Sequence, residues 1–320
     1  MASLRNNYMP RREVITLPRA LNFEPVTADD MGAMTPLLRQ ARSRSCDFTA
    51  GGVFLWLQYF GYERCIIDNT LFIKGLSEDI SRRPSFALPI GNIPLEECVD
   101  MIKHYCLVHN LDPLFTAVPE DRLGDLISLG KAEVTELTDW ADYIYLASDL
   151  VSLTGKKYNK KRNHVHRFEA DNPGCRLDPL DHNSLPEAID FFENLGIESD
   201  KADPIMAEFE REQVLDVLRN YDEYPFEGAV LRDGKGHIVA FTAGEVSGDT
   251  LVLHIEKMAH SISGAGETIN NYFARYMLSR HPEIVYINRE DDSGDPGLRY
   301  AKQSYHPAMM LRKYNVLMKD

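Results

Sequence analysis

Three apolar runs rich in β-branched residues follow one another between residues 227 and 258, and short turns containing Gly and Asp separate them. The first turn contains Asp233 and Gly234, and the second contains Gly248 and Asp249. Apolar runs of this length joined by such turns are typical of an antiparallel meander. The runs span residues 227–231, 237–246 and 250–258. This stretch therefore predicts that the second half of the chain is built on a sheet whose strands are neighbours in sequence.

The same order of elements is predicted twice along the chain: helix, meander, helix, strand, helix and strand. In the first half these are a helix from Thr27 to about Arg42, strands over 54–59, 62–67 and 71–74, a helix over 94–109, a strand over 114–118, a helix over 121–129 and strand over 133–146. In the second half they are helices over 180–195 and 204–220, the meander, a helix over 267–279, a strand over 285–287, a helix over 296–303 and a strand over 309–318.

This shared order predicts an α+β fold that arose by structural duplication. A chain of 320 residues is long for one core and comfortable for two domains of ordinary size. We therefore expect a lead-in over residues 1–21, an N-terminal domain over 22–147 and a C-terminal domain over 148–320, each a mixed sheet flanked by helices.

A Gly-rich turn lies between the last strand of the meander and the helix predicted over 267–279. The backbone N–H groups of such a turn and the positive end of the helix dipole form a common phosphate site. Two glycines would let a diphosphate approach the backbone closely. The alternative is a plain junction between strand and helix, because short Gly motifs are common. The candidate phosphate-binding residues are Ser261, Ser263, Gly264, Ala265 and Gly266.

A basic run over residues 156–167 contains six Lys or Arg residues, two His residues and no acid, in a chain whose net charge is −14. That net charge argues against a general nucleic-acid or membrane-surface binder. The basic run indicates instead a local contact with an anion, such as the phosphates of CoA, of a tRNA or of a nucleotide-linked precursor. Lys160, Lys161 and Arg162 are the candidates. The alternative is a solvated helix face.

Glu256 and His254 lie near the end of the last meander strand, and a period of two would place both side chains on one face. A carboxylate there could take a proton from an attacking amine or orient it, and the histidine could be a second acid/base group. The alternatives are an ion pair between Glu256 and a neighbour such as Lys257, and a histidine that is simply packed and hydrogen-bonded.

Five polar residues, 288–292, follow the strand predicted over 285–287, at the end where ligands collect in α/β-type sheets. Asn288 is a candidate contact for a substrate carbonyl or amide. Arg289, Glu290 and Asp292 are candidate substrate-binding residues, and either acid could hold an amino group. The alternative is a capped, solvated loop. The acids have no partner set at ligand spacing, so we expect no metal.

Arg299 and Lys302 are three residues apart on a short predicted helix, so they share one face. We take both as candidate substrate-binding residues.

Three segments together resemble a bacterial family related to the C-terminal, aminoacyl-transferring domain of phosphatidylglycerol lysyltransferase. They are Lys156-Lys157-Tyr158-Asn159-Lys160-Lys161-Arg162-Asn163-His164; His254-Ile255-Glu256-Lys257 with the Gly turn and Ile269-Asn270-Asn271; and the stretch from Tyr286-Ile287-Asn288-Arg289-Glu290-Asp291-Asp292-Ser293-Gly294 to Leu298-Arg299-Tyr300-Ala301-Lys302-Gln303-Ser304-Tyr305-His306-Pro307. The resemblance covers most of residues 22–318. It implies a tandem pair of GNAT-like (acyl-CoA N-acyltransferase-like) folds, similar also to Fem-type enzymes that transfer amino acids from tRNA.

Two further expectations come from the resemblance. The Gly turn is similar to the acyl-CoA pyrophosphate loop of GNAT enzymes, but Ser261 stands where those enzymes have Arg or Gln. This departure favours an aminoacyl-tRNA donor over acyl-CoA and leaves the backbone part of the site intact. In GNAT-like enzymes a tyrosine near the position of Tyr305 can protonate the leaving group, so the resemblance makes Tyr305 a candidate catalytic residue. The alternative is a tyrosine that is simply packed in the core.

The rest of the sequence bears on where in the cell the protein is found. The five cysteines are scattered without a C-x-x-C pair, and no apolar run reaches the ~20 residues that span a bilayer. The N-terminus lacks the apolar core of a signal peptide. We expect a cytoplasmic protein without a membrane span.

The run Ala50-Gly51-Gly52 precedes the first predicted strand and is misplaced for phosphate binding, so we expect the N-terminal copy to be degenerate.

Three functions remain open at this point. The chain could transfer an acyl group from CoA, or an aminoacyl group from tRNA, to an amine or hydroxyl on a small-molecule or precursor acceptor. It could instead be a non-catalytic binding module for a phosphate-bearing ligand. The sequence leaves the donor, the acceptor and the oligomeric state undecided.

Overall fold

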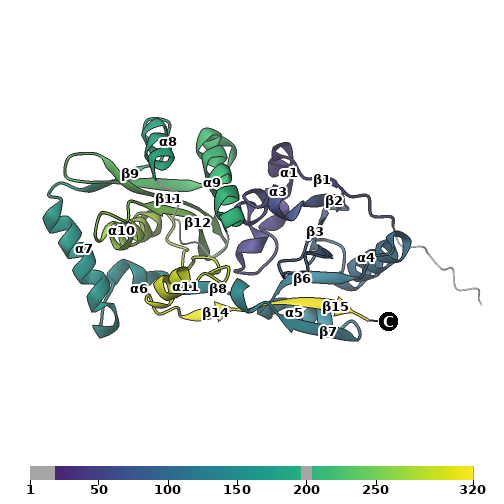
Figure 1. Ribbon diagram of the computed structural model, residues 1–320. Helices are drawn as coiled ribbons and strands as arrows, with labels where there is room; N and C mark the ends of the chain where they lie inside the picture. The colour runs from purple at the N-terminus through teal and green to yellow at the C-terminus, as the bar shows by residue number, and fades with distance from the viewer. Residues whose placement is uncertain (1–18, 196–203, 320) are drawn as a thin grey trace, which may run out of the picture.

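The computed structural model describes residues 19–195 and 204–319, which form two mixed sheets with helices packed against them (Figure 1). In sheet A the strand order is β1-β2-β3-β4-β6-β15-β7, and β5 pairs with β3. Its strands are β1 (Glu24–Pro25), β2 (Glu63–Ile67), β3 (Thr70–Leu76), β4 (Pro84–Phe86), β5 (Ile90–Gly91), β6 (Leu114–Pro119), β7 (Ala132–Glu136) and β15 (Lys313–Met318). Its helices are α1 (Met31–Leu38), α2 (Ala50–Phe54), α3 (Leu57–Phe60), α4 (Leu95–His109) and α5 (Glu120–Ile127).

Sheet B has the strand order β14-β8-β13-β12-β11-β10-β9. Its strands are β8 (Asp142–Leu146), β9 (Arg176–Pro179), β10 (Glu227–Arg232), β11 (Ile238–Ser247), β12 (Thr250–Met258), β13 (Tyr286–Asn288) and β14 (Met309–Leu311). Its helices are α6 (Ala147–Ser152), α7 (Asn159–Asp171), α8 (Leu185–Asn194), α9 (Pro204–Arg219), α10 (Ala265–Arg280) and α11 (Pro296–Gln303). The predicted meander is β10, β11 and β12, which pair in antiparallel order.

The two sheets share one plan, in which a meander is followed by a parallel pair of strands. The parallel pair is β4 with β6 in sheet A and β12 with β13 in sheet B. Beside this pair, each sheet accepts a strand from the other half of the chain. β15 lies antiparallel to β6 in sheet A, and β8 lies antiparallel to β13 in sheet B. The halves therefore exchange strands, and Figure 1 shows the yellow strands β14 and β15 leading from one half into the other.

This exchange bears on the domain boundary expected near residue 148. A cut at that point leaves β8 with the half that forms sheet A and β15 with the half that forms sheet B. Sheet A is built from strands within residues 24–136 together with 313–318, and sheet B from strands within residues 142–311. The sequence pattern identifies both segments as strands, but it carries no information about which sheet each one joins.

The expectation of a strand over residues 54–59 is wrong, because this stretch is helical. Thr49 begins α2 as its N-cap, with its hydroxyl accepting a hydrogen bond from Gly52 N at 3.1 Å. Gly61 ends α3 in the left-handed conformation, with φ of 59°. The aromatic residues that suggested a strand instead place Phe54 and Phe60 in the buried interior.

Helices cover both faces of sheet B. One face packs against α8 and α9 through a cluster that includes Phe192, Val214 and Phe241. The other packs against α10 through Leu251, Leu253 and Phe273 and through a smaller cluster around Ile269. The predicted α+β class is confirmed. Across the described ranges, every helix is too short or too polar to cross a membrane.

Candidate active site

The candidate site lies where β12 and β13 separate. The two strands pair only over residues 250–252 and 286–288, after which β12 continues beside β11 as far as Met258. Glu256 lies on this extension of β12, and Arg289 directly follows β13. Their side chains meet across the gap, with Arg289 Nη2 2.8 Å from Glu256 Oε1.

A β-bulge at His254 sets the direction of the side chains on β12. Ala243 of β11 pairs with Ile255, while the next residue, Gly244, pairs with Leu253, so His254 is an extra residue without a partner in the ladder. Leu253 therefore packs with the α10 cluster, whereas Ile255 packs with the α8 and α9 cluster. The expectation that His254 and Glu256 share a face is wrong, because it assumed an unbroken period of two.

Glu256 is the centre of a largely buried polar cluster on the α10 side of the sheet. Its Oε1 accepts the hydrogen bond from Arg289, and its Oε2 accepts one from Asn270 Nδ2 at 3.3 Å. The Arg289 guanidinium lies 5.0 Å from the centre of the Tyr305 ring. Lys161 of α7 lies over the same ring at 4.0 Å and contacts Glu267 Oε1 at 3.3 Å. Four predicted site residues, Glu256, Arg289, Tyr305 and Lys161, thus come together here.

Two atoms of this cluster have unused hydrogen-bonding capacity. Arg289 Nη1 and Asn270 Oδ1 are both buried and have no hydrogen-bond partner among the residues described. They belong to the two side chains that bind opposite oxygens of Glu256. Buried polar atoms are nearly always paired, since an unpaired one costs about 1–3 kcal/mol. A free donor and a free acceptor, on two side chains that contact the same carboxylate, are therefore the pattern expected where a ligand binds.

The charge states follow from burial and neighbours. Burial opposes the charge on Arg289, but Glu256 together with Tyr145, Tyr305 and Glu267 outweighs burial and raises the pKa of Arg289. Burial raises the pKa of Tyr305 well above its usual range, and nearby Arg289 only partly offsets this, so the phenol stays neutral. Burial lowers the pKa of Lys161, and Glu267 partly restores it. The site thus offers a fixed cation, a carboxylate and a neutral phenol within one cluster.

His254 lies apart from this cluster, on the other side of the sheet. Its Nδ1 lies 2.7 Å from Glu290 Oε1 and its Nε2 lies 3.1 Å from Glu245 Oε1. Burial opposes protonation, but the two carboxylates outweigh it and raise the pKa of His254 to about 9. Its side chain is fully buried and both ring nitrogens already have carboxylate partners, so this imidazolium positions Glu290.

The other predicted residues of the 288–292 loop mainly hold the loop in place. Asn288 Nδ2 donates to Arg44 O at 2.6 Å and to Asp142 Oδ2 at 2.9 Å, which ties β13 to the first half of the chain. Asp292 accepts hydrogen bonds from Tyr143 at 2.6 Å and from Arg299 at 2.6 and 2.8 Å. Two predicted substrate-binding side chains therefore bind each other.

Lys302 of α11 is buried and its side chain points to this loop. Its ammonium donates to the backbone carbonyl of Asp291. Burial lowers its pKa, and Asp291 partly restores it. Like Asn288 and Asp292, it fixes the shape of the loop that carries Arg289.

The Gly turn is used for close packing within the protein. Gly264 caps α10 with φ of 83°, and a Cβ at this position would lie 2.5 Å from His164 O of α7. A Cβ at Gly266 would lie 2.5 Å from Met258 Sδ. Ala265 is buried, while Ser263 is exposed. Gly264 is thus explained by tight packing against α7 and Gly266 by its contact with Met258 of β12, whether or not the turn binds phosphate.

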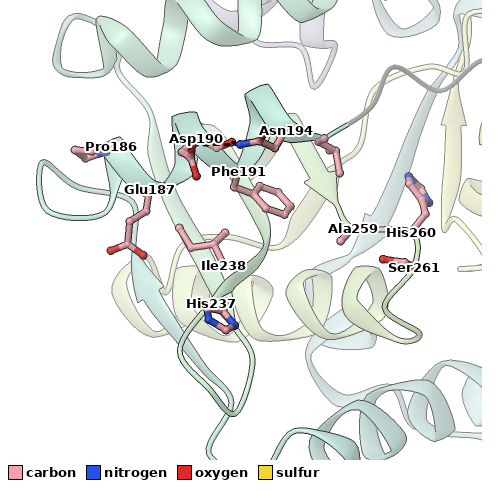
Figure 2. Close-up of a pocket in the computed structure, with 11 residues that line it drawn as sticks. Pro186, Glu187, Asp190, Phe191, Asn194, His237, Ile238, Ala259, His260 and Ser261 are labelled. Atoms are coloured by element: carbon pink, nitrogen blue, oxygen red, sulfur yellow. Dashed lines mark hydrogen bonds between the residues drawn. The ribbon is translucent and has the colours of Figure 1, made fainter.

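A hollow of about 720 Å³ opens beside the first residue of this turn, between α8 and the ends of β11 and β12 (Figure 2). Ser261 and His260 line one side of it, and Glu187 and Asp190 line the α8 side. The lining does not include Glu256 or Arg289.

The basic run divides into inward and outward residues. Besides Lys161, Arg162 faces inward and donates to Leu153 O and to Gly155 O at 3.0 Å. Lys156 and Lys160 are exposed, and no ion pair forms between either of them and another described residue. The helix therefore connects the Tyr305 cluster to a positively charged outer surface.

Sequence reasoning assigned no role to Asn270 or Gly51. Asn270 is nearly fully buried on α10, and its signal was the polar pair Asn270-Asn271 on an otherwise apolar helix face. Gly51 donates its N–H to Glu245 Oε1 at 2.7 Å and leaves space for the His254 ring. The only sign of this role in the sequence was a glycine within the short helix α2.

Comparisons with known proteins agree with this architecture. A conserved protein of unknown function from Bacteroides thetaiotaomicron is 29% identical, with 93% of this chain and 100% of that chain covered and a TM-score of 0.81. L-PGS from Bacillus licheniformis is 15% identical over 94% of this chain and 95% of its own, with a TM-score of 0.65. FemX is 10% identical over 93% and 98%, with a TM-score of 0.59. The matches to L-PGS and FemX show a similar fold.

The sequence matches no curated protein, but the profile of a protein family covers most of it. The family is described as phosphatidylglycerol lysyltransferase, C-terminal, and its profile matches residues 38–317. This family and the GNAT-like fold support a transferase. The chain belongs to the phosphatidylglycerol lysyltransferase C-terminal family.

Proposed function

We propose that the chain transfers an aminoacyl group from an aminoacyl-tRNA to an amine or hydroxyl acceptor, with the reacting ester held at Glu256, Asn270 and Arg289. The observation that carries this proposal is the buried, unpaired pair of atoms Arg289 Nη1 and Asn270 Oδ1. An aminoacyl ester presents a carbonyl oxygen next to a protonated amine. The carbonyl fits the free donor of Arg289, and the amine fits the free acceptor of Asn270 beside Glu256. An acetyl group has no amine to fill the second position.

In this reaction the acceptor attacks the carbonyl carbon of the ester. A new C–N or C–O bond forms, the bond to the terminal ribose oxygen breaks, and the acceptor's proton ends on that ribose oxygen. Arg289 stabilises the negative charge that develops on the carbonyl oxygen, a kind of contact whose loss typically costs 10²–10³ in rate. Tyr305, kept neutral by burial, supplies a proton to the leaving oxygen. Glu256 holds Arg289 in position and leaves room for the substrate amine.

The donor's phosphates are assigned to the outer surface of α7. Lys160 is exposed there, on the helix whose Lys161 reaches Tyr305, and Lys156 is exposed in the turn that directly precedes this helix. Phosphate contacts of this kind make binding sensitive to salt. The packing of Gly264 against α7 and of Gly266 against Met258 accounts for both glycines without a CoA pyrophosphate on that turn.

Stable analogues of the donor end test this proposal by isothermal titration. The probes are 3′-(aminoacylamino)-3′-deoxyadenosines, with 3′-amino-3′-deoxyadenosine and acetyl-CoA as comparisons. We expect the aminoacyl analogues to bind and the unacylated nucleoside to bind at least about tenfold more weakly, because the aminoacyl group makes the charge-assisted contacts. Arg289→Lys and Glu256→Gln should remove this difference.

The matched control is Arg167→Lys, at an exposed arginine of α7 that forms an ion pair with Asp171 at 3.5 Å. It should bind the analogues like the unaltered chain. Binding of acetyl-CoA but not of the analogues would replace the proposal with acyl-CoA transfer. Binding of none of them would leave a module for a different ligand.

A further inference from the structure

A small cavity lies in sheet A at the point where β4 and β6 separate. The two strands share one pair, Phe86 with Phe115, and the cavity is lined by residues on both sides of that pair, Ser85 and Ala87 on the β4 side and Thr116 and Ala117 on β6. Its volume is about 30 Å³, which is room for one water-sized group. It is the counterpart, in the N-terminal half, of the gap between β12 and β13.

The cavity is lined by polar atoms that lack partners. Ser85 is fully buried, and its Oγ has no hydrogen-bond partner within the described ranges. The same holds for Oε2 of Glu78, which also lines the cavity. Asp47 and Tyr62 complete the polar part of the wall. A buried hydroxyl and a buried carboxylate oxygen without donors point to a group that supplies N–H or O–H.

The surrounding charges favour a cation as that group. The ammonium of Lys313 is buried and already has three partners. It lies 2.7 Å from a carboxylate oxygen of Asp47, 2.8 Å from one of Asp142 and 3.4 Å from Cys46 Sγ. Glu78 makes no ion pair with any described residue. Burial, and after it the charge of Asp47, raises the pKa of Glu78 well above its usual range. A cation bound beside Glu78 would counter both effects, because it would stabilise the charged form of this carboxylate.

We propose that this cavity binds a primary ammonium group, such as the head of a small alkylamine. An ammonium is about the size of water and carries three N–H donors, which suit Glu78 Oε2, Ser85 Oγ and Asp47. Mg²⁺ or Ca²⁺ is a poorer fit, because each needs six or more ligands, mostly oxygen atoms. Asp47, Leu76 and Glu78 retain some exposure, which gives the amine a way in. The N-terminal half then holds a binding site of its own, and this inference does not depend on the proposed transfer.

The experiment is a thermal-unfolding titration of the full chain with methylammonium chloride, against tetramethylammonium chloride and potassium chloride at the same concentrations. A ligand that binds the folded state raises the unfolding temperature in a saturable way. We expect this response to methylammonium alone. Glu78→Gln and Ser85→Ala should each weaken the apparent affinity, by about tenfold or more for Glu78→Gln, since that substitution removes a charge-assisted bond. Both substitutions are close in size to the original residues, so the variants should remain folded.

Glu96→Gln is the matched control, because Glu96 is an exposed acid on α4 of the same half. It should respond like the unaltered chain. The proposal is overturned if methylammonium gives no stabilisation, which would leave water as the occupant. An equal response to potassium would replace the ammonium with a monovalent metal ion. An unchanged affinity in both cavity variants would place the bound amine elsewhere.

Discussion

The side chain that Gly51 lacks would occupy the same space as the imidazole of His254. A Cβ at position 51 would lie 2.3 Å from His254 Cδ2, and that ring is held on both sides by Glu245 and Glu290. The ring therefore has little freedom to move away. A single missing side chain in the first half of the chain thus preserves a buried charge network in the second half.

We expect Gly51→Ala to lower the free energy of unfolding by about 1–3 kcal/mol, the usual range for overpacking a core. The sign is informative, because Gly to Ala inside a helix otherwise stabilises by roughly 0.5–1 kcal/mol. Urea unfolding of the variant measures the change. Gly124→Ala in α5 is the control, since nothing lies within 4 Å of its added Cβ, and it should be neutral or stabilising. A stabilised Gly51→Ala variant would mean that His254 is not held where the structure places it.

At the scale of elements, the contact between α7 and α10 depends on Gly264. We expect Gly264→Ala to destabilise the protein in the absence of any ligand. The left-handed conformation, with φ of 83°, costs an alanine about 1–2 kcal/mol, and the Cβ would also strike the His164 carbonyl. Hydrogen exchange should show reduced protection along α7. Gly32→Ala, where the added Cβ meets nothing within 4 Å, should leave α7 unchanged. Unaltered protection in Gly264→Ala would remove the packing explanation for this glycine.

Elements with a regular local pattern were predictable from the sequence. The helix predicted over 94–109 is α4, and the strand predicted over 62–67 is β2. The prediction for residues 54–59 was wrong because their aromatic composition suggested a strand. The stretch is instead helical, with an N-cap at Thr49 and a C-cap at Gly61. The bulge at His254 was invisible because a period of two cannot reveal one extra residue.

The site was only partly predictable for a similar reason. Glu256, Arg289 and Tyr305 were selected by residue type and by their place at the ends of elements, and they do lie together. Asn270 was not selected, because a polar residue on a helix is ordinarily assigned to solvent. Asp292 and Arg299 were assigned to substrate although they bind each other, since sequence alone cannot tell an internal ion pair from a free one.

At the scale of the whole molecule, the exchange of β8 and β15 decides which parts of the chain can fold alone. Fragment 148–320 lacks β8, the neighbour of β13, and carries β15 without the strands it pairs with. Fragment 140–312 has the same length but contains every strand of sheet B and ends before β15. An unpaired strand edge in either sheet is an aggregation hazard.

We therefore expect fragment 140–312 to be monomeric and to unfold cooperatively, and fragment 148–320 to aggregate or to lack a cooperative transition. Size-exclusion chromatography and thermal unfolding followed by circular dichroism distinguish the two outcomes. Co-expression of residues 1–147 with 148–320 should restore a folded complex, because each fragment then supplies the strand that the other sheet needs. If 148–320 alone folds as well as 140–312, the exchanged strands are dispensable and the halves are independent domains. If neither folds alone, the buried contacts between the halves, such as Lys313 with Asp142, contribute as much to stability as completing the sheets.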